Sequence, residues 1–236
     1  MNNIIMKKYD IFLFDADHTL FDYDMAEAVA LKTMFDRCGF DCIDYSEDIR
    51  QRFREINSQL WQKFEKSEIT SYQLQTFRFE LLFDELGVAY DVKKFNREYL
   101  PELGKGGFLM DGALEICEYI ASCGKPIYII TNGMTVTQKL RVSNSLIKDY
   151  ISALFISESI GFNKPHISYF EHVLANIPPV TKEKILIIGD SLAADIAGGN
   201  NASIDTCWFN ETGVENHTGI VPTYEIRTLS EVRKFV

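Results

Sequence analysis

The sequence predicts an α/β fold, in which a doubly wound parallel sheet forms the core and an all-helical domain is inserted. Three observations lead to this prediction. Short apolar runs of strand length recur along the chain, amphipathic helical patterns separate them, and the region 21–103 contains helical patterns only. Strands that alternate with helices are typical of a parallel sheet with helices on both faces.

Five apolar runs are predicted as strands because they are rich in β-branched and aromatic residues. Their apolarity is nearly continuous, which indicates burial on both faces, as in a parallel sheet. The predicted strands are Tyr9–Phe14, Pro126–Thr131, Ala153–Ser157, Lys184–Gly189 and Asp205–Phe209. Apolar residues at helical spacing lie between them, namely Leu114, Cys117, Ile120 and Ala121 in one stripe and Ile167, Phe170, Val173 and Leu174 in another.

The region 21–103 breaks this alternation and is predicted as a helical domain inserted into a core of residues 1–20 and 104–236. It is far longer than an ordinary loop. Ser46, which precedes two acidic residues, is a predicted helix N-cap. The glycines within Gly104–Gly107 predict a flexible return to the core. The helical stripes are Ala26, Val29 and Ala30; Ile49, Phe53, Ile56, Leu60 and Phe64; and Leu74, Phe77 and Leu81.

Composition and charge argue against several function classes. The chain has 236 residues, of which 46% are apolar, so it can bury a sizeable core. Its net charge of −10 repels polyanions, and we expect no nucleic-acid polymer as a partner. No apolar run resembles a signal peptide or approaches the ~18 residues of a membrane helix, so we expect a cytoplasmic protein without a membrane partner. The five cysteines lack CxxC spacing and indicate neither a disulfide framework nor a zinc site.

Polar residues follow the predicted strands at the edge where α/β sheets bind their ligands, outside the carboxyl ends of the strands. Any one of these motifs alone is typical of an ordinary turn. Their occurrence together at several strand ends favours a functional site. The motifs are Asp15-Ala16-Asp17-His18-Thr19 after the first strand, Thr131-Asn132-Gly133 at the second, Lys164 before the fourth, and Asp190 and Asp195 after it.

These residue types together suit phosphoryl transfer. Asp15 and Asp17 lie two residues apart on an extended chain and point the same way, about 6–7 Å apart, so one carboxylate can attack while the other moves the proton. Asp15 and Asp190 supply hard oxygen ligands for Mg²⁺. Lys164 adds a compact positive charge, and the Thr131 hydroxyl with nearby backbone N–H groups donates hydrogen bonds to a phosphate.

The ordered motifs DxDxT, TNG, Lys-Pro and GDxxxxD resemble those of the haloacid dehalogenase (HAD) superfamily of hydrolases, over nearly the whole chain. The resemblance implies a Rossmann-like core, and the helical insertion resembles the C1 cap domain of that superfamily. It further implies that Asp15 is the nucleophile and a Mg²⁺ ligand. Asp17 would be the general acid/base, with its backbone carbonyl on the metal, and Thr19 of the same motif a supporting residue.

The same resemblance implies roles for the later motifs. Thr131 and the backbone of Asn132 would bind phosphate, and Lys164 would hold both the phosphate and the nucleophile. Asp190 would ligate Mg²⁺ directly or through water. Asp195 matches the last acidic position of the pattern, which supports the metal-bound water or the lysine.

Asp17 also favours one branch of the superfamily. Dehalogenases and phosphonate hydrolases of this kind usually lack the second aspartate, whereas phosphatases keep it to protonate the leaving alkoxide. Four segments are similar to the bacterial pyrimidine-type 5′-nucleotidases: FDADHTLFDYD, ITSYQLQTFRF, ISESIGFNKPHISYF and CWFN. This similarity implies nucleoside 5′-monophosphates as the small phosphomonoester substrates. Another ester, of sugar-phosphate or phosphoglycolate type, and non-catalytic binding of a phosphate ligand are the alternatives.

Two further residues, His18 and Arg78, are interpreted from the sequence. His18 stands where many members of the superfamily have glycine, which implies a change at the hinge of the cap. Arg78, within the helical insertion, is interpreted as lying on a solvated helix face. The sequence leaves the preferred base, the sugar and the oligomeric state open.

Overall fold

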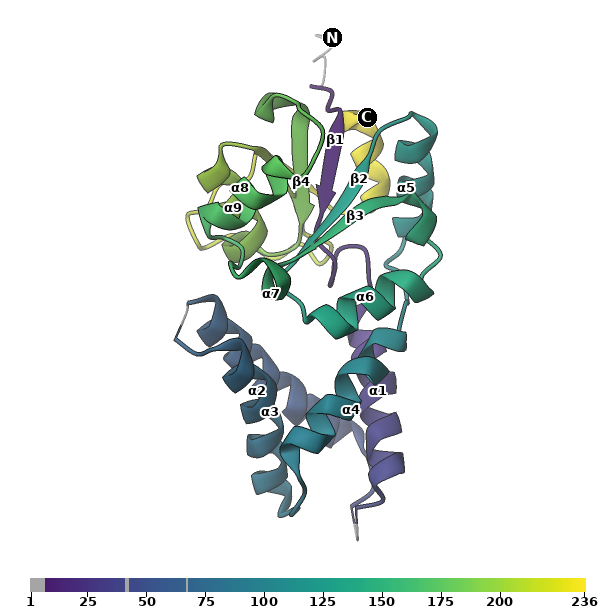
Figure 1. The fold of residues 1–236 in the computed structure, drawn as a ribbon, viewed down its shortest axis with the longest axis vertical. Helices are drawn as coiled ribbons and strands as arrows, with labels where there is room; N and C mark the ends of the chain where they lie inside the picture. Colours follow the sequence, from purple (N-terminus) through teal and green to yellow (C-terminus); the bar gives the residue numbers. More distant parts are fainter. Residues whose placement is uncertain (1–6, 41–42, 67) are drawn as a thin grey trace. The chain divides into compact units, whose positions relative to one another are not determined.

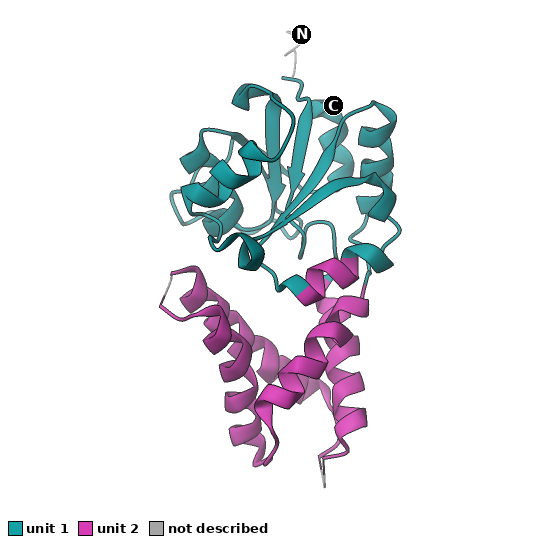
Figure 2. Ribbon diagram, viewed as in Figure 1, with its two compact units in different colours: residues 1–22, 107–135, 142–236 teal, residues 23–106, 136–141 magenta. Residues whose placement is uncertain are grey.

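The computed structural model of the protein describes residues 7–40, 43–66 and 68–236. The chain forms two compact units, which Figure 2 distinguishes by colour. Unit 1 comprises residues 1–22, 107–135 and 142–236, and unit 2 comprises residues 23–106 and 136–141. Unit 2 therefore contains two segments, 104–106 and 136–141, that were expected in the core, while residues 21–22, expected in the inserted domain, belong to unit 1.

Unit 1 is built on a six-stranded sheet in which all neighbouring strands are parallel (Figure 1). The strand order β3-β2-β1-β4-β5-β6 confirms the predicted doubly wound topology. The strands are β1 (Ile11–Phe14), β2 (Ile127–Thr131), β3 (Ile151–Ile156), β4 (Ile185–Gly189), β5 (Asp205–Phe209) and β6 (Tyr224–Ile226).

Two of these strands differ from the prediction. β3 lies at one edge of the sheet, begins earlier than predicted, and buries only Phe155 and Ile156, so burial on both faces was wrong for this strand. β6, at the other edge, was not predicted. Its three residues, of which only Ile226 is buried, are too few to show a pattern of apolar residues.

Helices cover both faces of the sheet in unit 1 (Figure 1). On one face, Phe12 and Phe14 of β1 join a buried cluster with Ile116 and Ile120 of α5, and the C-terminal segment η4 completes this layer. On the other face, Ile11 and Leu13 pack in a cluster with residues of α8. The helical segments are α5 (Ala113–Ser122), α6 (Thr135–Asn144), η1 (Lys148–Tyr150), α7 (Ser157–Ile160), α8 (Ile167–Ala175), η2 (Lys182–Lys184), η3 (Leu192–Ile196), α9 (Ala197–Ala202) and η4 (Leu229–Phe235).

Unit 2 contains four long helices and, in its described residues, no strand. These helices are α1 (Tyr23–Cys38), α2 (Glu47–Glu65), α3 (Ser71–Leu86) and α4 (Val92–Lys105). Ser46 caps α2, since its side chain accepts a hydrogen bond from the Ile49 N–H at 3.4 Å, as predicted. Thr70 and Gln73 form a capping box at the start of α3. The interior is mainly aromatic, with contacts among Phe35, Phe53, Phe79, Phe83, Phe95 and Tyr99.

Three sequence-based interpretations of unit 2 were wrong. Val29 and Leu81 were assigned to buried stripes, but their side chains are exposed. Gly104 was interpreted as part of a flexible return, yet it is buried within α4. A Cβ atom there would lie 2.8 Å from the Cβ of Leu140 and 2.9 Å from the Thr137 carbonyl oxygen. Close helix packing therefore requires glycine at this position.

The third wrong interpretation concerns Arg78, which does not lie on a solvated helix face. Its side chain is 2% exposed. The guanidinium donates to the side-chain oxygens of Asn57 at 3.4 Å and Asn96 at 3.0 Å, and it lies over the rings of Phe79 and Tyr99. Arg78 thus links three helices of unit 2.

Two further features concern the described residues as a whole. None of their helices is long and apolar enough to cross a membrane. Four cysteines, Cys38, Cys117, Cys123 and Cys207, are free thiols, while Cys42 lies outside the described residues.

Candidate active site

The motif after β1 begins with a buried carboxylate. Asp15 still pairs with the neighbouring strand, since its N–H donates to the Ile188 carbonyl oxygen at 2.8 Å. Asp17 is half-buried, and His18 is exposed. His18 has a φ of 59°, in the left-handed region that glycine adopts without strain. This backbone conformation gives a physical reason for the glycine that many superfamily members have here.

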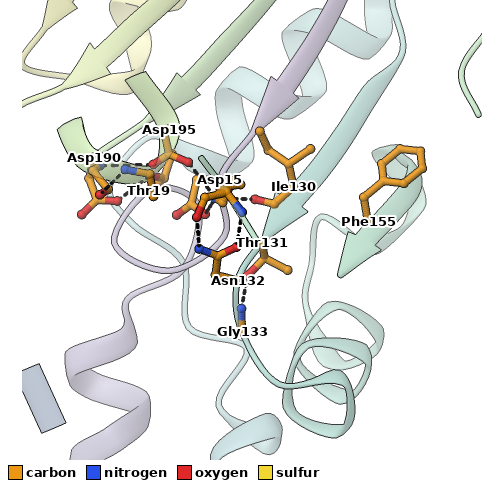
Figure 3. Close-up of polar contacts among 12 residues, drawn as sticks. Asp15, Thr19, Ile130, Thr131, Asn132, Gly133, Phe155, Asp190 and Asp195 are labelled. Atoms are coloured by element: carbon orange, nitrogen blue, oxygen red, sulfur yellow. Dashed lines mark hydrogen bonds and ion pairs between the residues drawn. The ribbon is translucent and has the colours of Figure 1, made fainter. Parts of the chain in front are cut away.

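Lys164 makes three polar contacts in the site, with Asp15, Asp195 and Ile130, which lie close together in Figure 3. Its Nζ donates to Asp15 Oδ1 at 2.5 Å, to Asp195 Oδ1 at 2.6 Å and to the Ile130 carbonyl oxygen at 2.9 Å. The side chain is 2% exposed. Burial lowers the pKa of the Lys164 ammonium, but Asp15 and Asp195 outweigh this effect and raise it above its ordinary value. Lys164 is therefore a protonated cation that joins two carboxylates.

The Thr131-Asn132-Gly133 motif forms the turn after β2. The Thr131 hydroxyl accepts a hydrogen bond from the Gly133 N–H at 3.0 Å. The Asn132 side chain binds the backbone of Lys164, both as donor and as acceptor, at 2.9 Å each. Sequence reasoning considered only the backbone of Asn132 and missed this function of its side chain.

Asp190 and Asp195 follow β4 and complete a cluster of acidic side chains. Carboxylate oxygens of Asp15, Asp190 and Asp195 all lie within 4.8 Å of one another, whereas the Asp17 carboxylate lies outside this group. Desolvation raises the pKa of Asp190 well above its usual range, and the charges of Asp15 and Asp195 raise it further. The Thr19 hydroxyl is 3.5 Å from Asp190 Oδ1, at the limit of a hydrogen bond.

This cluster fits a Mg²⁺ ion. Mg²⁺ prefers hard oxygen ligands and usually retains several waters, so it needs few carboxylates from the protein. Asp15 and Asp190 are suited to direct contact. Asp195 differs, because one of its oxygens accepts from Lys164 and the other from the Ser191 N–H at 3.2 Å. A divalent cation would also relieve the mutual repulsion that raises the pKa of Asp190.

The local sequence explains the turn that presents these aspartates. Ser191 is the N-cap of η3, and its hydroxyl accepts from the Ala194 N–H at 3.1 Å. Sequence reasoning gave no hydrogen-bonding role to two buried aromatic residues of unit 1, Trp208 and Tyr169. The Trp208 indole N–H donates to the Asp190 carbonyl oxygen at 2.8 Å, and the Tyr169 hydroxyl donates to the Phe155 carbonyl oxygen at 2.9 Å. The sequence signal for these two hydrogen bonds is the residue type alone, because a buried Trp or Tyr usually needs a hydrogen-bond acceptor.

Comparison with known proteins agrees with this arrangement. Residues 12–209 match the family model described as haloacid dehalogenase-like hydrolase. The chain is 38% identical over 227 residues to the HAD-hydrolase YfnB of Bacillus subtilis, covering 96% of this chain and 95% of that protein. It is 37% identical over 224 residues to the pyrimidine 5′-nucleotidase PynA of Streptococcus pneumoniae, covering 95% and 93%. It is 33% identical over 234 residues to the pyrimidine 5′-nucleotidase YjjG of Escherichia coli, covering 97% and 98%.

Comparison with solved structures also finds similar proteins. The crystal structure of YfnB bound to magnesium matches with a TM-score of 0.89 at 38% identity, covering 96% of this chain and 97% of that one. An L-2-haloacid dehalogenase from Xanthobacter autotrophicus has a TM-score of 0.73 at 15% identity, covering 95% and 96%, which shows a shared fold alone. The family model and the three relatives all match this chain over most of its length. The protein therefore belongs to the haloacid dehalogenase-like hydrolases.

Proposed function

We propose that this protein is a Mg²⁺-dependent phosphatase that hydrolyses nucleoside 5′-monophosphates through an aspartyl-phosphate on Asp15. The observation that carries this proposal is the position of Lys164 Nζ, 2.5 Å from Asp15 and 2.6 Å from Asp195. A buried lysine between two carboxylates fixes the position of the Asp15 carboxylate, as a nucleophile requires, and places a cation where phosphate charge must be neutralised.

The reaction divides into two steps. In the first, the Asp15 carboxylate attacks phosphorus, the bond to the leaving oxygen breaks, and Asp17 donates its proton to that oxygen. In the second, Asp17 takes a proton from water, the resulting hydroxide attacks phosphorus, and orthophosphate leaves with Asp15 restored. The half-buried position of Asp17, two residues after Asp15, suits a group that must reach both the leaving oxygen and water.

The other motif residues bind the phosphate and the metal. Thr131 and the Asn132 backbone N–H donate hydrogen bonds to the phosphoryl oxygens, and Asn132 holds the Lys164 backbone in place. Asp15, Asp190 and the Asp17 carbonyl would hold Mg²⁺, and the ion, when bound, neutralises phosphoryl charge. Asp195 holds Lys164 through a second ion pair, at 2.6 Å.

The choice of nucleotides rests on the relatives. PynA and YjjG, both named pyrimidine 5′-nucleotidases, match this chain over almost their entire lengths. The matches extend over the helical unit as well as the core. A sugar phosphate or a phosphoglycolate-type ester remains the alternative substrate.

Phosphate release from a panel of esters tests the proposal. The panel contains uridine, thymidine, cytidine and adenosine 5′-monophosphates, sugar phosphates and phosphoglycolate, each with Mg²⁺ and with a chelator. Asp15→Asn is the blank, and its thermal unfolding shows whether it is folded. We expect Mg²⁺-dependent release that is highest with pyrimidine nucleotides and absent in the variant.

Other results would change the proposal in defined ways. Highest activity on a non-nucleotide ester would keep the mechanism and refute the substrate class. Full activity in a folded Asp15→Asn protein would refute the mechanism. A wild-type protein that binds phosphate and hydrolyses no ester would favour a binding protein on this fold.

A further inference from the structure

Trp208 makes a polar contact that packing alone does not require. It lies on β5, beside Gly189 of β4 in the sheet register, and its side chain is 4% exposed. Its indole Nε1 donates to the backbone carbonyl oxygen of Asp190 at 2.8 Å. A buried tryptophan needs some acceptor, and the acceptor here belongs to the residue whose carboxylate faces Asp15.

The hydrogen bond fixes one end of the peptide group between Asp190 and Ser191. The other end is fixed as well, since the Ser191 N–H donates to Asp195 Oδ2 at 3.2 Å. Asp195 in turn accepts from Lys164 at 2.6 Å. Trp208 is thus the first member of a chain of contacts that runs through this peptide and Asp195 to Lys164.

The plane of this peptide sets the direction in which the Asp190 side chain leaves the backbone. Direction matters here because the carboxylate is close to those of Asp15 and Asp195, within 4.8 Å, and is repelled by both. Without a restraint on the peptide, rotation that separates the charges is favoured. A restraint from Trp208 keeps the oxygen ligands together before a cation arrives.

We propose that Trp208 is a positioning residue of the metal site, which holds the Asp190 backbone so that its carboxylate and that of Asp15 bind one divalent cation. This inference rests on the proposed function, since it assumes the Mg²⁺ site described there. Trp208 acts through Asp190 and touches neither metal nor substrate. Groups that orient metal ligands from outside the first layer typically change metal affinity about 10- to 100-fold when removed.

Two variants of Trp208 test this role. Trp208→Phe removes the N–H together with part of the ring. Replacement of Trp208 by 3-benzothienylalanine, in which sulfur takes the place of the N–H, keeps the size of the ring and removes only the donor. The control is Trp61→Phe, which changes the other tryptophan of the chain, on α2 in unit 2.

The measurement is Mg²⁺ titration by calorimetry on the full chain, with thermal unfolding in chelator as a second readout. We expect both Trp208 variants to bind Mg²⁺ about 10-fold more weakly and Trp61→Phe to bind as the wild type does. Phosphatase activity of the Trp208 variants should recover at saturating Mg²⁺. A purely structural role would lower the unfolding temperature and leave the Mg²⁺ affinity unchanged.

Two results would overturn the inference. One is wild-type Mg²⁺ affinity in the 3-benzothienylalanine protein, even if Trp208→Phe is impaired, because the defect would then come from the lost ring volume. The other is a wild-type protein that does not bind Mg²⁺ at all. If the wild type binds Mg²⁺, responds to loss of the indole N–H and hydrolyses no phosphate ester, only the proposed function fails.

Discussion

The side chain of Asn132 binds both backbone polar groups of Lys164. Its Nδ2 donates to the Lys164 carbonyl oxygen and its Oδ1 accepts from the Lys164 N–H, each at 2.9 Å. A carboxamide carries a donor and an acceptor side by side, so it can pair with a peptide segment as a neighbouring strand would. This pairing joins the turn after β2 to the segment that carries Lys164, 32 residues later.

We expect Asn132→Ala to impair activity more than stability. The variant loses both hydrogen bonds, so the free energy of unfolding should fall by about 1–3 kcal/mol. The Lys164 backbone is then no longer fixed, and kcat/KM should fall at least about 10-fold. The control is Asn201→Ala, which removes an exposed asparagine that donates to the Pro165 carbonyl oxygen. Equal loss of kcat/KM in both variants would contradict a special role for Asn132.

Mg²⁺ should stabilise the folded protein. A ligand that binds only the folded state at 100 times its Kd raises the free energy of unfolding by about 2.7 kcal/mol. Asp190→Asn should remove this response, and it should raise stability in chelator because one of three converging carboxylates is gone. Asp149→Asn, at an exposed position in η1, should respond to Mg²⁺ as the wild type does. Thermal unfolding with and without Mg²⁺ measures these effects, and an undiminished response in Asp190→Asn would argue against the metal site.

Glu27 should make stability depend on pH. Its side chain on α1 is 1% exposed, and burial raises its pKa to about 7 from an ordinary value of 4.5, although Arg54 and Arg50 oppose the shift. The unfolded carboxyl loses its proton near pH 4.5, whereas the folded one keeps it until about pH 7. The stabilising contribution is therefore complete below pH 4.5 and is lost as pH rises through 7.

Glu27→Gln should remove this part of the pH dependence. The amide does not ionise, so the variant should gain stability relative to the wild type between pH 5 and pH 8. Urea unfolding at several pH values in chelator measures the difference. Glu171→Gln, at an exposed position on α8, should leave the pH dependence unchanged. If Glu27→Gln showed the wild-type slope, Glu27 would be ionised throughout this pH range.

Arg78→Ala should destabilise the protein strongly. The variant leaves the buried side-chain oxygens of Asn57 and Asn96 without their donor and removes the guanidinium from the rings of Phe79 and Tyr99. We expect the free energy of unfolding to fall by about 3 kcal/mol. Arg52→Ala is the matched control, because Arg52 pairs with Glu85 at the surface and its loss should lower the free energy of unfolding far less. Similar losses measured by urea unfolding in the two variants would show that burial of Arg78 contributes little.

Local sequence patterns were sufficient to predict much of the fold and the edge of the sheet at which the motifs lie. Apolar runs marked β1, β2, β4 and β5, and the capping pattern marked the start of α2 at Ser46. Because the carboxyl ends of parallel strands meet at one edge, the sequence also predicted that Asp15, Lys164 and Asp190 would lie together.

Tertiary structure alone decided the contacts between residues far apart in the chain. Arg78 has the charge of a surface residue, and only its contacts with Asn57 and Asn96 show that it is buried. Gly104 lies in a glycine-rich stretch of the kind that is typical of a linker, but close helix packing requires glycine there. Trp208 lies in an apolar run, as a core residue does, and no residue near it in the sequence identifies the Asp190 carbonyl as its hydrogen-bond acceptor. Periodicity and capping depend on neighbours within a few residues, whereas hydrogen-bond partners across the fold depend on how the elements pack.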